Sequence, residues 1–401
     1  MKPFHLLLAT AGINHFVFSG SKLAVLLYAV HLDASPAVVG LLTALFAALG
    51  ITTSVSTGRW VDRIGPRSPM LYSSLLMAAG AATAFVWHDL AALFVVSTVV
   101  GTLYNVYFIG NQQQVGRHGR PEDRMGNFSL SMQIYSAASF AAPLVTGFAI
   151  DHMGYANTFL LLAALPLIPA LIIGTNNLPF IAEPNSRSKA SADAGSKTGS
   201  RPRSVWDLLR IVDLRRVFIA ALLTHVGWNL YTFLMPVYGA QIALSASEIG
   251  MVVSAFSLAA VIVRSFLTTM ARRLTAWQVL LISLCIASAG LIAMPLFSNI
   301  SALLVLSALL GMSLGVGAPI SLSLMYDVAP ASRIGEVLGL RLAMINALQT
   351  IVPLGAGAIG AALGVRPVFW ALATVLIAGT WATRKQWHAP RAKHVEKEVQ
   401  S

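Results

Sequence analysis

Three side chains within one apolar stretch carry groups that could exchange protons or bind ions. His15, Ser19 and Lys22 stand in residues 6–30, which are otherwise mostly apolar. Positions four and seven apart lie on the same face of a helix, so the three side chains form one polar stripe. An imidazole changes its charge near physiological pH, and a buried ammonium needs an anion or an acidic partner. The stripe therefore indicates proton exchange, anion binding or both.

The composition indicates whether this stripe lies in a soluble domain or in a membrane. The chain has 401 residues, of which 56% are hydrophobic and only 10% are charged, whereas soluble domains carry about 25% charged residues. The mean hydropathy is +0.73. Lipid must therefore cover most of the surface, and there a lysine costs roughly 2.5–3.5 kcal/mol or more. The net charge is +12, and the basic residues lie in short segments between apolar runs, which argues against nucleic-acid binding. The single cysteine excludes a disulfide framework.

Membrane-spanning helices need about 20 mostly apolar residues, and the chain offers twelve such runs. We therefore expect an all-α integral membrane protein with twelve transmembrane helices. The predicted spans are 6–30, 36–58, 69–87, 90–112, 128–150, 155–174, 215–240, 247–270, 277–297, 300–326, 335–363 and 365–384.

The basic residues predict the orientation of these spans. They gather in the loops that follow even-numbered spans, and the opposite loops contain only Arg366. The positive-inside rule then places both termini in the cytoplasm. Because the first apolar run continues well past a sequence that resembles a cleavage site, we expect a span there and not a signal peptide. The predicted domains are a six-helix bundle over 1–175, a basic cytoplasmic linker over 176–213, a second six-helix bundle over 214–385 and a cytoplasmic tail over 386–401.

An internal repeat relates the two predicted bundles. An offset of 210 residues places PLVTGFAIDHMGY on PLGAGAIGAALGV, with the proline and both glycines in register. Two parallel repeats are a transporter architecture in which substrate lies near the midplane between the halves. We therefore predict two pseudo-symmetric bundles, with Pro143 and Pro353 bending equivalent helices. The aligned pairs include His15 with His225, Gly40 with Gly250, Gly101 with Gly311, Gly147 with Gly357 and Gly154 with Gly364.

The repeat supplies the polar stripe with a counterpart at His225, Asn229 and Thr232. Each histidine either titrates or stays neutral against a neighbouring helix. Lys22 lies roughly 12 Å from the outer end of its span, and no acid lies within any predicted span, so its expected partner is a substrate or a carbonyl group. Arg264 and Arg341 either face the same space or extend to the membrane surface. Other side chains that could reach this space are Tyr104, Asn105, Asn111, Gln133, Trp228, Asn346 and Gln349.

Residues 58–67 read GRWVDRIGPR and resemble the signature loop of the major facilitator superfamily. With twelve spans, a basic central linker and a six-plus-six repeat, the resemblance covers essentially the whole chain. It implies that this loop latches the cytoplasmic side shut, with Asp62 facing the start of span 335–363. The alternative is a turn that only sets topology. The residues that the resemblance assigns to the latch are Gly58, Asp62, Arg63, Gly65 and Arg67, with Arg117 as a basic partner.

The family resemblance implies a secondary transporter with alternating access, and not an enzyme. Residues 138–147 partly match the antiporter signature of the superfamily, which favours efflux; proton-coupled uptake of a small organic acid is the alternative, and a membrane sensor or scaffold that moves no solute is a more remote one. The lack of a mid-span acid favours an anionic or neutral solute over a lipophilic cation. No metal or nucleotide motif is evident, so a proton gradient is the expected energy source. We expect a monomer in the plasma membrane, which is the inner membrane in a Gram-negative bacterium.

Overall fold

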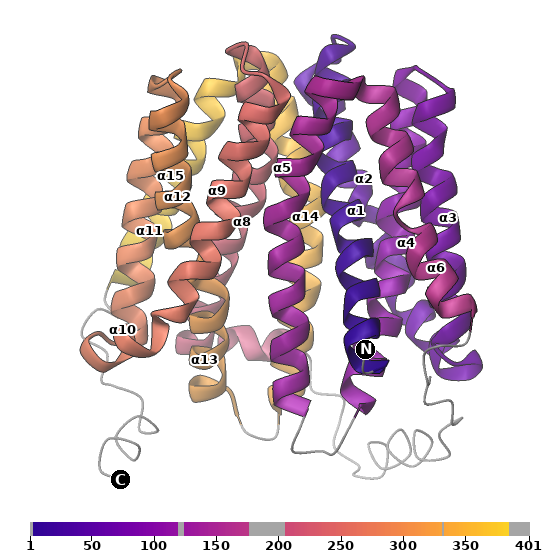
Figure 1. Ribbon diagram of the computed structural model, residues 1–401. Helices are drawn as coiled ribbons and strands as arrows, with labels where there is room; N and C mark the ends of the chain where they lie inside the picture. Colours follow the sequence, from indigo (N-terminus) through magenta and orange to yellow (C-terminus); the bar gives the residue numbers. More distant parts are fainter. Residues whose placement is uncertain (1–2, 119–123, 176–204, 331–332, 385–401) are drawn as a thin grey trace. The chain divides into compact units, whose positions relative to one another are not determined.

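A computed structural model describes residues 3–118, 124–175, 205–330 and 333–384 (Figure 1). Within these ranges every regular element is a helix. The N-terminal part contains α1 (Pro3–His31), α2 (Pro36–Ile64), α3 (Arg67–Val86), α4 (Leu90–Arg117), α5 (Arg124–Ala164) and α6 (Leu167–Gly174). The C-terminal part contains η2 (Val205–Arg210), α8 (Val212–Gln241), α9 (Ala246–Ser265), α10 (Leu267–Arg273), α11 (Ala276–Ala293), η3 (Met294–Leu296), α12 (Ile300–Gly315), α13 (Gly317–Val328), α14 (Ile334–Leu363) and α15 (Val365–Thr383).

The described helices account for the twelve predicted spans. Ten helical stretches are long and apolar enough to cross a membrane, and a shorter apolar helix covers Pro36–Gly50. One of the ten, Gly126–Gly174, has 49 residues and holds two predicted spans. Gly154, with φ of 77°, separates those two spans within α5. Large apolar side chains are also exposed, for example Val86 at 76% and Leu363 at 69%, as expected for a surface in contact with lipid. The all-α membrane fold is therefore confirmed.

Three predicted spans are each built from two α-helical stretches. Span 155–174 comprises the end of α5 and α6. Span 247–270 comprises α9 and α10, which are separated at Phe266. Span 300–326 comprises α12 and α13, which are separated at Val316. A break of this kind frees backbone carbonyl groups from their helical hydrogen bonds, and in a membrane those groups must find donors elsewhere.

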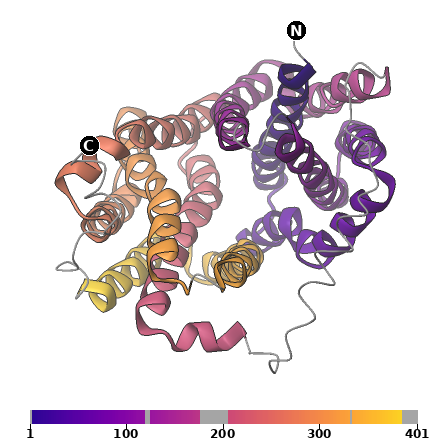
Figure 2. The ribbon, with the colours of Figure 1, turned by 90° about the horizontal axis from the view of Figure 1, so that it is seen from below.

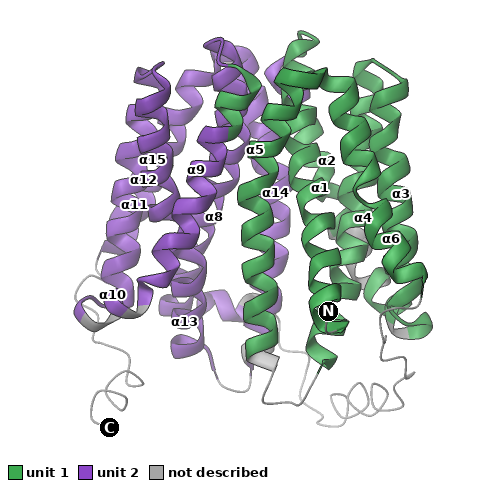
Figure 3. Ribbon diagram, in the orientation of Figure 1, with its two compact units in different colours: residues 1–34, 41–203, 245–250 green, residues 35–40, 204–244, 251–401 purple. Residues whose placement is uncertain are grey.

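The chain forms two compact units (Figure 3). Unit 1 comprises residues 1–34, 41–203 and 245–250, and unit 2 comprises residues 35–40, 204–244 and 251–401. The start of α2 thus belongs to unit 2, and the start of α9 belongs to unit 1. In unit 1, α1 packs on α4 and α5, and α3 packs on α4; in unit 2, α8 packs on α13, α14 and α15. The end-on view in Figure 2 shows the helices as separate coils.

The glycines and prolines of the repeat form equivalent helix crossings. In unit 1, a Cβ at Gly250 would collide with the carbonyl oxygen of Pro143 and would also approach Gly147. In unit 2, a Cβ at Gly40 would collide with the carbonyl oxygen of Pro353 and would also approach Gly357. Small residues let helices approach closely in lipid, so these aligned positions hold the start of α9 on α5 and the start of α2 on α14.

Candidate functional site

His15 lies at the centre of a polar cluster in unit 1. Its Nδ1 atom lies 2.5 Å from the hydroxyl oxygen of Tyr104 on α4, and its Nε2 atom lies 2.8 Å from the Oγ atom of Ser139 on α5. Both hydroxyl groups can donate or accept a hydrogen bond. The two partners can therefore satisfy a neutral imidazole, which has one donor and one acceptor, and also an imidazolium, which has two donors.

Aromatic rings extend this cluster around His15. The Tyr135 ring meets the imidazole edge-on at a centroid distance of 5.1 Å, and the buried Asn111 side chain donates a 2.8 Å hydrogen bond to the Tyr135 hydroxyl group. On the other side, Phe18 stacks on Tyr104 at 4.2 Å. Three helices thus contribute to the cluster, which brings together the predicted residues His15, Tyr104 and Asn111.

The other predicted residues of unit 1 have different surroundings. Ser19 and Lys22 are partly buried on α1, and Lys22 has no hydrogen-bond or ion-pair partner among the described residues. The Asn105 side chain lies against Gly50, at the crossing of α4 with α2. Gln133 is exposed on α5, and its position two residues before Tyr135 directs it away from the cluster.

His225 pairs with α14 in unit 2. The Gln349 amide nitrogen lies 3.3 Å from His225 Nε2, and the amide group of Asn229 donates a 3.0 Å hydrogen bond to the His225 carbonyl group. The Thr232 hydroxyl group in turn donates to the Asn229 carbonyl group at 2.9 Å. The second stripe therefore bonds largely to its own helix, and His225 makes a cross-helix contact through its side chain, as His15 does.

Two arginines of unit 2, Arg264 and Arg341, have different surroundings. The Arg264 guanidinium carbon lies 5.9 Å from the centroid of the Trp228 ring, and its Nε donates a 3.1 Å hydrogen bond to the Gly315 carbonyl group. Arg341 is partly buried on α14, and its Nε atom is buried with no hydrogen-bond partner among the described residues.

The predicted latch loop joins α2 to α3. α2 extends through Gly58 as far as Ile64, and Gly65, with φ of 80°, makes the turn before Arg67. Arg67 Nε donates to the Ile173 carbonyl group at 3.3 Å, and Arg67 Nη2 donates to the Gly174 carbonyl group at 3.1 Å. Because these are the last carbonyl groups of α6, Arg67 stabilises the C-terminus of that helix.

The remaining charged residues of the predicted latch are Arg63, Arg117 and Asp62. Arg63 is exposed in the last turn of α2, and Arg117 is partly exposed in the last turn of α4. The side chain of Asp62 lies outside the described residues. The latch role of this loop therefore stays a prediction.

Asp151 makes a contact that the sequence did not indicate. Its carboxylate accepts hydrogen bonds from the backbone N–H groups of Ala246 at 3.0 Å and Ser247 at 2.8 Å, and from the Ser247 hydroxyl group at 2.5 Å. These groups form the N-terminus of α9, where a carboxylate is favourable. The position 210 residues later is Ala361, so the repeat does not reproduce this contact.

We expect Asp151→Asn to loosen the N-terminus of α9. The amide keeps one acceptor but loses the charge and the second acceptor, a loss of about 1 kcal/mol for such a cap. Hydrogen exchange followed by mass spectrometry should show the amides of residues 246–247 exchanging roughly fivefold faster, as that energy implies. The start of α2, with no such acid, serves as the internal control. Unchanged exchange at Ala246 and Ser247 would show that Asp151 does not hold this helix end.

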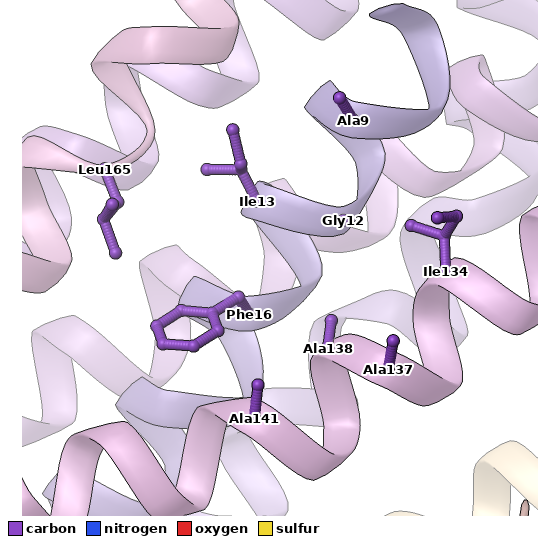
Figure 4. A pocket seen from close by; sticks show the side chains of 9 residues that line it. All are labelled: Ala9, Gly12, Ile13, Phe16, Ile134, Ala137, Ala138, Ala141 and Leu165. Atoms are coloured by element: carbon purple, nitrogen blue, oxygen red, sulfur yellow. The ribbon is translucent and has the colours of Figure 1, made fainter. Parts of the chain in front are cut away.

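A cavity of about 410 Å³ lies on a different face of α1, beside α5 (Figure 4). The view shows only carbon atoms in the labelled side chains, including those of Ile13, Phe16 and Ala138. None of the predicted polar residues lines it. Such walls offer apolar contact alone, so we do not place the polar site there.

Sequence signals for Ser139 and Asp151 were present but weak. Ser131, Tyr135 and Ser139 recur every four residues in an apolar span, which places them on one helix face. That spacing would have indicated a second polar stripe facing His15. Asp151 follows the same span and has no acidic counterpart in the repeat, but nothing in the sequence names its partner.

The apolar helices define a multi-pass α-helical membrane protein. The model of the Major Facilitator Superfamily matches residues 7–243 and 217–400. The chain therefore belongs to the major facilitator superfamily, a family of transporters, as its motif and repeat predicted.

Individual relatives agree with this family. The quinolone resistance protein NorA of Staphylococcus aureus (strain MRSA252) is 30% identical over 124 residues, which cover 31% of this chain and 32% of that protein. The same protein from strain Mu50 / ATCC 700699 is 29% identical over 124 residues, with the same coverage. The chain thus matches about a third of the length of these curated relatives.

Solved structures share the fold. A mutant of the peptide transporter POT superposes with a TM-score of 0.79 at 16% identity, covering 96% of this chain and 94% of that one. A POT family transporter in complex with 5-aminolevulinic acid superposes with a TM-score of 0.72 at 14% identity, covering 96% of each chain. At these identities the likeness concerns the fold alone.

Proposed function

We propose that the protein is a proton-coupled secondary transporter of small organic anions or neutral hydrogen-bonding solutes, and that it works in the direction of efflux. Membership of the family supports solute transport by alternating access between parallel repeats. The observation that carries the proposal is the placement of His15 between two hydroxyl groups near the middle of α1. It shares a helical stripe with Lys22, which has no partner among the described residues. This arrangement combines a titratable group with a cation.

Lys22 favours an anionic solute. Its backbone lies roughly 13 Å from the nearer end of α1 at 1.5 Å per residue, so its ammonium group does not easily reach water. No Asp or Glu stands in the middle of a predicted span, so no protein acid neutralises Lys22 at that depth. A substrate carboxylate would supply the missing negative charge, whereas an organic cation would be repelled.

The partial match to NorA supports efflux. That relative is described as a quinolone resistance protein, and export is a direct route to resistance. The aligned Pro143 and Gly147, at the crossing with Gly250, also belong to the segment that resembles the antiporter signature.

The test is solute flux in proteoliposomes with an internal pH dye. We expect organic acids to change the pH gradient and amines to leave it unchanged. Lys22→Ala should raise the KM for a transported acid about tenfold, the equivalent of one charge-assisted hydrogen bond. Arg215→Ala, which removes an exposed charge, is the matched control.

Three results would contradict parts of this proposal. Transport of amines alone would exclude an anion site at Lys22. Movement of acids without any proton movement would exclude proton coupling. Solute binding without flux in intact vesicles would make the protein a sensor and not a transporter.

A further inference from the structure

Arg264 has an unusual position for a cation near the end of a membrane helix. It stands in the last turn of α9, nine residues before Arg273 at the end of α10. An arginine at such a site commonly extends toward the nearer membrane surface, where its charge meets water. The contacts of its guanidinium group show which direction it takes.

The guanidinium group extends toward the middle of unit 2. Trp228, over whose ring it lies, comes 16 residues after the start of α8 and 13 residues before its end. Gly315, whose carbonyl group it binds, comes 15 residues after the start of α12 and 13 residues before the end of α13. At 1.5 Å per residue, both contacts lie roughly 20 Å from either end of these spans. Arg264 therefore does not extend to the surface.

The helix break at Val316 makes this contact available. The Gly315 carbonyl group stands at the end of α12, where the helical hydrogen bonding is interrupted before α13. A Cβ at Gly315 would lie 2.8 Å from Ala260 Cα, so glycine permits the close approach of α9. The carbonyl group and the Trp228 ring together hold the guanidinium in one orientation, because the planar group combines a directed donor with a face that packs on an aromatic ring.

The charge of Arg264 has no described acidic partner. Only its Nε is hydrogen-bonded in the described part of the chain, which leaves the donors of both terminal nitrogens for another group. The acids in the described part of unit 2 stand near helix ends, and three of them pair with other arginines: Asp207 with Arg210, Asp213 with Arg216, and Glu336 with Arg333. Arg264 is exposed, and its contacts fix its guanidinium group deep within the span. A pre-oriented guanidinium fork at that depth is suited to a carboxylate, which binds it with two parallel hydrogen bonds.

We propose that Arg264 is a binding residue for the carboxylate of an organic acid, with Trp228 supplying apolar contact to the rest of the molecule. The inference rests on the proposed function for its biological use, and it deepens that function by naming the chemical class and one binding group. The Gly315 carbonyl group acts as a positioning group, because it fixes the guanidinium without contacting the ligand.

The test measures equilibrium binding of carboxylates to purified protein by calorimetry. The probes are acetate, benzoate and 2-naphthoate, with benzamide as the uncharged analogue of benzoate. We expect benzoate or 2-naphthoate to bind, and Arg264→Gln to weaken that binding about tenfold to hundredfold. Arg264→Lys should weaken it about tenfold, because lysine keeps the charge but lacks the planar fork. Benzamide should bind equally to all three proteins, and Arg273→Gln should leave carboxylate binding unchanged.

A second measurement uses the unaltered protein and so avoids any folding defect of a variant. Phenylglyoxal modifies accessible arginines, and peptide mass spectrometry locates the modified side chains. Bound benzoate should protect Arg264 at least fivefold and should leave the modification of Arg273 unchanged, because a ligand at saturating concentration blocks only the groups that it contacts.

The outcomes separate this inference from the proposed function. Unchanged carboxylate affinity in a folded Arg264→Gln protein, absence of protection at Arg264, or failure of all three carboxylates to bind would overturn the inference while leaving transport open. Carboxylate binding that depends on Arg264 in a protein that moves no solute would support the inference and overturn the transport function.

Discussion

His15→Gln is expected to abolish proton-driven accumulation of solute while leaving solute exchange largely intact. Glutamine can still form hydrogen bonds with the Tyr104 and Ser139 hydroxyl groups, so the helix contacts of His15 are mostly retained. It cannot take up a proton, whereas imidazole changes its charge between pH 5 and 8 in its ordinary state. Accumulation driven by a pH gradient should fall to the level of protein-free vesicles. Counterflow of labelled against unlabelled solute, which needs no net proton movement, should persist.

The control is another histidine of the same unit. His152 is exposed near the end of the first half of α5, and its Nδ1 lies 2.9 Å from the Phe148 carbonyl oxygen of its own helix. His152→Gln should leave both assays unchanged. If His15→Gln accumulates solute as the unaltered protein does, His15 does not carry the proton. If a folded His15→Gln protein loses counterflow as well, His15 serves substrate binding and not coupling alone.

Gly311→Ala is expected to cause the largest loss of stability. A Cβ at Gly311 would collide with the carbonyl oxygen of Phe256 and would lie 2.8 Å from its carbonyl carbon and 2.9 Å from its Cα atom. These are backbone atoms, so the clash cannot be relieved by rotating a side chain. Phe256 is also held by the buried Tyr231, which stacks on it at 4.2 Å and donates a 2.7 Å hydrogen bond to Ser307. The helices must separate, at a cost of about 3 kcal/mol.

The measurement is the yield of monodisperse protein in detergent together with the midpoint of thermal unfolding. Gly101→Ala should give a similar loss, because a Cβ there would collide with the backbone of Phe46 in unit 1. Gly355→Ala is the matched control on α14, where a Cβ would have no neighbour within 4 Å. That variant should be neutral or stabilised by up to about 1 kcal/mol, since alanine is the better helix former. Equal behaviour of Gly311→Ala and Gly355→Ala would contradict the close crossing.

Much of the fold could be predicted because membrane proteins obey strong local rules. The bilayer requires apolar runs of fixed length, and the helical period then determines which residues share a face. The repeat at 210 residues also identified glycines and prolines that form helix crossings, because such crossings in lipid depend on small residues at a fixed spacing. Gly40, Gly250, Gly147 and Gly357 all lie at such crossings in the structure. The pairing of Gly154 with Gly364 extends to the backbone, since both have positive φ.

The sequence by itself thus determined the class of the protein, its spans, its repeat and the face of α1 that carries His15 and Lys22. Only the tertiary structure decided the partners of the polar groups. His15 meets Tyr104 and Ser139 across 89 and 124 residues of chain, and Arg264 reaches Gly315 across 51. A helical pattern places a side chain on a face, but it does not say which helix lies opposite. The sequence pattern of Arg264 is the same whether its side chain extends to the membrane surface or toward the middle of unit 2. The break between α12 and α13 decides between these orientations, because it offers the Gly315 carbonyl group as a partner.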